Sequence, residues 1–188
     1  MEAKLNEQTT STRTLSNARA GEAASDRMGA LDVLRLLLLG IWLGAAIFFS
    51  FAVAPSAFAV LPARELAGAI VTRTIGIVNV GGTLVGLLLL ATAFAGRAGS
   101  AAKRARTLEI VALALVVLAT GIGHWVISAR MAALRLSMGR PIDEVAQNDP
   151  LRLAFNNLHG YSVAAMTTAM LASLVAFILI ARRNRRNA

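Results

Sequence analysis

The sequence predicts an all-α integral membrane protein, a bundle of four helices that cross the bilayer up, down, up and down. Of its 188 residues, 56% are hydrophobic and 15% charged, which is too apolar for a soluble domain with a polar surface. The charges lie between and beyond four long uncharged runs. Because a hydrocarbon core about 30 Å thick needs roughly 20 apolar helical residues to cross it, each run is long enough to span a membrane.

The predicted organisation has three parts. Residues 1–30 are polar, with no run able to form a core or a signal peptide, and we expect a disordered tail. Residues 31–182 form the membrane domain and residues 183–188 a basic C-terminal tail. Met28, just before the first span, is an alternative to Met1 as the translation start. The predicted spans cover residues 34–60, 66–95, 107–129 and 153–181.

The first span contains an uncharged run from Leu36 to Ala63. On a helical wheel, one stripe about 80° wide holds Gly40, Gly44, Phe48, Phe51, Pro55 and Phe58. Gly40 and Gly44 form a small-xxx-small pair, which allows close helix packing in lipid. Trp42 lies about 10 Å inside the helix and is expected to pack within the bundle.

The second span follows a tight connection, with Pro62 fitting its first turn. It carries a second small-xxx-small pair, Gly82 and Gly86, which we expect at a helix interface. Asn79, near its middle, is able to join helices through its amide or to contact a ligand. Arg73 is close enough to the membrane surface for its side chain to reach the headgroups.

A basic turn over residues 96–107 leads to the third span, whose uncharged part is Ile110–Ala129. Glu109 stands at the edge of this run, so no carboxylate is expected inside any span. That argues against a carboxylate-based proton pump or cation antiporter. Pro141 ends the helix, and Asp149 with Pro150 predicts the start of the fourth span, as N-cap and first helical residue.

The distribution of Lys and Arg predicts that both termini are cytoplasmic. The N-terminal segment up to Arg35 has five, the second connection four and the C-terminal tail four, whereas the opposite side has six. Basic residues are enriched on the cytoplasmic side of membrane proteins. Membrane anchoring also accounts for the net charge of +9 without nucleic acid. We expect a multi-pass protein of the cell membrane whose partners are the bilayer and further copies of the chain or a larger complex.

Polar groups at membrane depth are costly and are therefore the first functional candidates. His124 and His159 enter from opposite sides and are predicted at similar depth in the outer leaflet. His124, Met131 and Met138 repeat every seven residues, while one face of the fourth helix holds His159, Ser162, Met166, Met170 and Ser173. Imidazole and thioether suit Cu(I), and two facing histidines can ligate haem, which favours a metal or haem site between helices three and four. Alternatively, the methionines fill packing gaps and each histidine bonds a carbonyl or a headgroup.

Several kinds of chemistry are excluded or unsupported. The chain contains no cysteine, which excludes disulfides, thiolate metal sites and cysteine nucleophiles. No nucleophile–base pair, metal-binding His-Glu motif or phosphate loop is visible, so we expect neither an enzyme nor a bound cofactor.

Two motifs resemble the small membrane proteins related to transmembrane protein 205. The first comprises residues 40–44, residues 48–51 and Pro55, and the second comprises residues 155–159 and Ser162, at the start of the last helix. The resemblance extends from Leu34 to about Arg182 and implies a four-helix membrane bundle of unassigned biochemistry. The candidates for structural or substrate contacts are Gly40, Trp42, Gly44, Phe51, Pro55, Arg73, Asn79, Phe155 and Ser162.

The function that we expect is that of a structural or accessory membrane component. The alternative is a transporter or a metal- or haem-handling protein that uses an outer-leaflet cluster of His and Met side chains between helices three and four.

Overall fold

The structure, a computed structural model, describes residues 29–95 and 103–187, with side chains described up to Arg183 except at Ala95. Three parts of the prediction lie outside the described residues: residues 1–28 of the tail predicted over 1–30, the alternative start at Met28 and residues 96–102 of the basic turn.

Four long helical spans form the bundle, and each is long and apolar enough to cross a membrane. They are Gly29–Val60, Arg64–Phe94, Lys103–Met138 and Pro150–Arg183. The labelled helices within them are α2 (Ala54–Val60), α3 (Arg64–Ala95), α4 (Lys103–Gly121), α5 (Ala129–Met138) and α6 (Pro150–Asn187).

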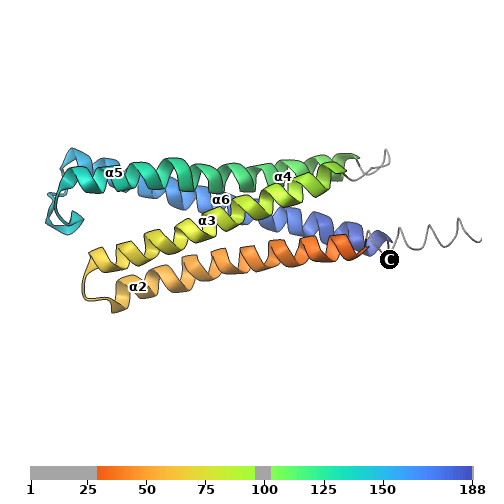
Figure 1. Cartoon of the computed structure of the whole chain (residues 1–188), viewed down its shortest axis with the longest axis horizontal. Coiled ribbons are helices and arrows are strands. Elements are labelled where there is room, and N and C mark those ends of the chain that lie inside the picture. Colours follow the sequence, from red (N-terminus) through yellow and green to blue (C-terminus); the bar gives the residue numbers. More distant parts are fainter. Residues whose placement is uncertain (1–28, 96–102, 188) are drawn as a thin grey trace, which may run out of the picture.

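The spans alternate in direction along the bundle (Figure 1). At one end lie the start of the first span, the end of α3, the start of α4 and the end of α6; we call it the termini end. At the other end, the connection end, lie residues 61–63 and 139–149. The predicted all-α, up-down-up-down membrane bundle is confirmed.

Two spans contain a π-helical turn. In the first span the turn is Phe49–Val53, and the N–H of Ala54 donates to the carbonyl of Phe49, five residues back. Pro55 follows directly; it has no N–H, and its ring crowds the carbonyl four residues earlier, which explains a wider turn here. In the third span the turn is Ile122–Ser128, where the Ser128 hydroxyl donates to the carbonyl of Gly123 at 2.9 Å.

The bundle is packed around two apolar clusters. One lies toward the termini end and contains Leu39, Leu89, Ala93, Ala112, Leu113, Ala176 and Ile180. The other lies farther along and contains Trp42, Ala46, Val116, Met166, Ala169 and Ala172. Met166 is therefore a packing residue of the core.

The glycine pairs behave differently from one another. A Cβ at Gly82 would lie 2.6 Å from Cε2 of Trp42, and a Cβ at Gly86 would lie 2.7 Å from Cγ2 of Val117. This pair lies at helix interfaces, as expected. A Cβ at Gly44 would have nothing within 4 Å, so Gly44 makes no close approach within the bundle.

The connection end shows how the third span stops and the fourth begins. After α5, Gly139 takes a left-handed conformation with a φ of 63°, and Pro141 follows. The N–H of Leu151 donates to Oδ1 of Asp149 at 2.8 Å, which confirms the predicted N-cap before Pro150. At the same end, α3 begins at Arg64, so Pro62 lies in the connection and not in the first helical turn.

Candidate functional site

The two histidines lie in different surroundings. His124 is half-buried, its ring packs edge-on against Trp125 with centroids 4.9 Å apart, and a Cβ at Gly76 of α3 would lie 3.7 Å from it. Its Nδ1 is buried and has no hydrogen-bond partner. His159 is exposed on α6. Over the described ranges, 29–95 and 103–187, no group of three or more His, Asp or Glu residues is arranged to hold a metal ion.

Asn79 lies at the same interface as His124. It is 3% exposed, and a Cβ at Gly123 would lie 3.1 Å from its Nδ2. One turn further along α3, the hydroxyl of Thr83 lies 2.9 Å from that of Thr120 on α4, and both are buried. Polar side chains thus join the second and third spans near the middle of the bundle.

The resemblance motif of the first span is divided between the interior and the surface. Trp42 is buried, as expected, and its indole N–H donates to the carbonyl of Val78 at 2.9 Å. In contrast, Phe51 is 75% exposed. The outward-facing residues, which we call the aromatic stripe, are Phe48, Phe51, Pro55 and Phe58.

The remaining candidates lie toward the connection end or at the surface. Phe155 is buried under the guanidinium of Arg135, whose Cζ lies 5.0 Å from the ring centroid. Arg135 also donates to the hydroxyl of Thr72 at 3.1 Å. Arg73 is exposed, and Ser162 is half-buried on α6.

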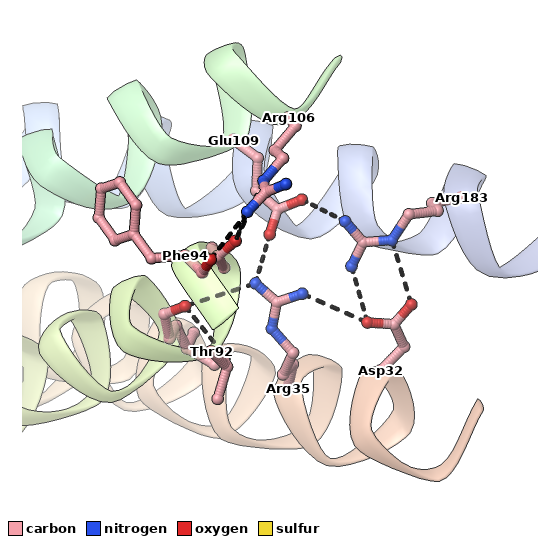
Figure 2. Close-up of polar contacts among 9 residues, drawn as sticks. Asp32, Arg35, Thr92, Phe94, Arg106, Glu109 and Arg183 are labelled. Carbon is pink, nitrogen blue, oxygen red and sulfur yellow. Dashed lines mark hydrogen bonds and ion pairs between the residues drawn. The ribbon is translucent and has the colours of Figure 1, made fainter. Parts of the chain in front are cut away.

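The most polar buried site was not among the sequence candidates. At the termini end, four charged side chains from three helices form a closed set of ion pairs, which we call the charge ring: Asp32, Arg35, Glu109 and Arg183 (Figure 2). Glu109, which the sequence placed at the edge of a span, is 1% exposed in α4. It is one of the most buried side chains in the described part of the bundle.

Each carboxylate of the charge ring binds both guanidinium groups. Glu109 accepts from Arg35 through Oε1 and from Arg183 through Oε2, the latter at 2.6 Å. Asp32 accepts from Arg35 at 3.3 Å, and from Nη2 and Nε of Arg183 at 2.7 and 3.2 Å. The ring therefore ties the first span, α4 and α6 together.

Main-chain carbonyls of α3 connect the second span to the same end. Arg35 donates a hydrogen bond to the carbonyl of Leu89 at 3.5 Å, and the hydroxyl of Thr92 donates to the same carbonyl (Figure 2). Arg106 of α4 donates to the carbonyls of Ala93 and Phe94, at 2.7 and 3.0 Å. The last carbonyls of a helix lack intrahelical partners and carry partial negative charge, so a guanidinium stabilises this end of α3.

The charge ring can be buried because it is neutral as a unit. Two carboxylates offset two guanidinium groups, and nearly every charged atom has a partner; Nε of Arg35 is buried without one. Removing one member would leave a buried charge uncompensated, which typically costs about 3–5 kcal/mol. The four side chains therefore act together in holding the helices to one another at the termini end.

A weak signal for the charge ring is present in the sequence. Asp32 and Arg35 are three residues apart just before an uncharged run, Glu109 directly precedes another, and Arg183 follows the last. Opposite charges at span ends on the same side of the membrane are candidates for pairing. The sequence does not reveal that they point inward, since basic residues at span ends also serve as ordinary membrane anchors.

Comparison with curated proteins gives no match, and comparison with solved structures gives none either. Among protein families, the model for a domain of unknown function, DUF4149, matches residues 37–140. That range holds the whole of the second and third spans and most of the first, including Trp42, Asn79, Glu109 and His124. It covers more than half of the chain, which therefore belongs to the DUF4149 family.

Proposed function

We propose that the protein is a structural or accessory component of the cell membrane and has no catalytic role. The charge ring carries this proposal, because its four charged side chains pair with one another and so join three helices. The other buried polar contacts are also of this kind: Trp42 binds the carbonyl of Val78, and Thr83 meets Thr120. In lipid, such contacts hold helices together.

The alternative function, transport or metal and haem handling, depends on His124 and His159. The exposure of His159 and the orientation of His124 toward Gly76 favour the accessory role. The experiment is to measure metal content and haem absorbance of the purified protein, beside His124→Ala and His159→Ala. We expect no bound metal and no haem band in any of the three. One metal or haem per chain, lost in either variant, would contradict the proposal.

Association with other membrane proteins follows from an accessory role, and the aromatic stripe is where we propose that a second copy packs. The first span is the least buried of the four: 22% of its most apolar stretch is buried inside the bundle, compared with 33–39% for the other three spans. Because the chain has no cysteine, single-cysteine variants report on this contact directly. We expect Phe51→Cys to give a disulfide-linked dimer in isolated membranes.

Ile70→Cys on α3 is the matched control. Ile70 is also exposed. Phe51 lies nine residues after Trp42, and Ile70 lies eight residues before Val78. Because Trp42 and Val78 are hydrogen-bonded to each other on antiparallel helices, Phe51 and Ile70 lie at a similar depth along the bundle. Equal cross-linking of both variants, or none, would refute packing at the aromatic stripe.

We further propose that the termini end is cytoplasmic and that the chain is related to the transmembrane protein 205 group. The excess of Lys and Arg at this end supports the orientation. Residues 40–55 support the kinship and lie entirely within the family match, whereas the second motif at 155–159 lies outside it. A C-terminal reporter active only in the cytoplasm tests the orientation; an inactive reporter on an expressed protein would contradict it.

A further inference from the structure

A shallow apolar groove runs between the first span and α6 at the termini end. Its volume is ≈ 410 Å³, and its walls are Val33, Leu36, Leu37, Gly40, Ile41 and Phe177. Gly40 keeps the groove open, because a Cβ there would lie 3.5 Å from the Phe177 ring and a longer side chain would occupy the space. Every wall residue is apolar.

The size and position of the groove suit one hydrocarbon chain. The helix from Val33 to Ile41 rises about 12 Å, at 1.5 Å per residue. The groove faces outward on a span that is long and apolar enough to cross a membrane, so it opens toward lipid and not toward water. An acyl chain lying in it would cover apolar surface on two helices at once.

The charged groups next to the groove suit an anionic headgroup. The ion pair between Asp32 and Arg183 joins the two helices that line the groove, the first span and α6. Asp32 directly precedes Val33 of the groove wall. The charge ring takes up Asp32 and Glu109, the two carboxylates that the described residues place at the termini end. Among the described residues, the exposed charged side chains at this end are therefore all cationic, namely Lys103, Arg104 and Arg182, and about a third of the Arg183 side chain is also exposed. Such surfaces attract anionic lipids.

We propose that this groove is a specific binding site for an anionic phospholipid, with one acyl chain between the first span and α6 and the phosphate beside Arg182 and Arg183. The site is separate from the aromatic stripe and goes beyond the accessory role. With the proposed orientation, the bound lipid belongs to the cytoplasmic leaflet and contacts the first span and α6, which the charge ring joins.

The test uses the full chain, purified in detergent and stripped of lipid, with phosphatidylglycerol or phosphatidylcholine of identical chains added. Native mass spectrometry counts the lipids bound. We expect one phosphatidylglycerol to bind well above the background of further lipids. Gly40→Leu should weaken this binding at least tenfold, whereas Gly44→Leu, the same change where a Cβ meets nothing, should leave it unchanged. If Gly40→Leu does not fold, Leu37→Trp fills the groove from its exposed wall and should give the same loss.

A second arm tests the headgroup. Arg182→Gln should reduce the preference for phosphatidylglycerol over phosphatidylcholine several-fold. Equal lipid binding by the Gly40 and Gly44 variants would overturn the acyl-chain site, and an unchanged preference in Arg182→Gln would overturn the headgroup position. A lipid-free dimer that Gly40→Leu abolishes would assign the groove to a second copy of the chain and overturn the proposal.

Discussion

Replacing Gly82 by alanine tests the tight contact between α3 and Trp42 of the first span. The added Cβ would lie 2.6 Å from Cε2 and 2.7 Å from Cζ2 and Nε1 of Trp42. Normal carbon contacts begin at about 3.5 Å, so the indole would have to move by about 0.9 Å. The ring is held by its hydrogen bond of 2.9 Å to the carbonyl of Val78, and a shift of this size away from α3 would break that bond.

The expected loss of stability has two parts. Overpacking of a core typically costs about 1–3 kcal/mol, and a broken hydrogen bond about 0.5–1.5 kcal/mol. Gly81→Ala is the matched control, because its Cβ would lie 3.8 Å from Cδ1 of Trp42, an ordinary contact. Both substitutions remove a helix glycine, so the gain in helix propensity, about 1 kcal/mol, cancels in the comparison.

We therefore expect Gly82→Ala to be about 2–4 kcal/mol less stable than Gly81→Ala. The assay is unfolding in mixed micelles with increasing sodium dodecyl sulfate, followed by circular dichroism. Equal unfolding midpoints for the two variants would show that Trp42 does not pack on Gly82, and the arrangement of the first span against α3 would then be wrong.

Two further predictions concern buried polar contacts and use the same unfolding assay. Glu109→Gln should lower the free energy of unfolding by about 3–5 kcal/mol, because Arg35 and Arg183 lose one of the two carboxylates that they share and the buried Arg35 is left with an uncompensated charge; a loss below about 1 kcal/mol would contradict a buried charge ring. A double-mutant cycle of Thr83→Val and Thr120→Val should give a coupling of about 0.6 kcal/mol, up to about 1.7; zero coupling would mean that the two hydroxyls do not meet.

The spans could be predicted from the sequence because crossing a membrane is a one-dimensional requirement. An uncharged run such as Ile110–Ala129 is long enough by itself, whatever its neighbours are. The interface role of Gly82 and Gly86 followed from their spacing, but their partners, Trp42 and Val117, did not. Gly44 has the same spacing from Gly40 and yet faces outward, since spacing alone does not tell which side of a helix meets the bundle.

The sequence holds only a weak signal for the charge ring, because most of its ion pairs join residues that are far apart in the sequence. Arg183 lies 151 residues from Asp32 and 74 from Glu109. The same pairing explains how the first span includes Asp32 and Arg35, which precede its uncharged run: charges that satisfy one another can be included in a membrane helix. Helix ends depend on hydrogen bonding and charge pairing, whereas the predicted spans end where the hydrophobic run ends.

The order of synthesis gives the charge ring a consequence for biogenesis. While the ribosome has made only the first three spans, Asp32 and Glu109 share a single ring cation, Arg35. The missing one, Arg183, emerges only with the end of α6. Until the last helix supplies Arg183, the ring residues of the nascent bundle therefore carry one negative charge in excess, and this local imbalance distinguishes an incomplete chain from a finished one.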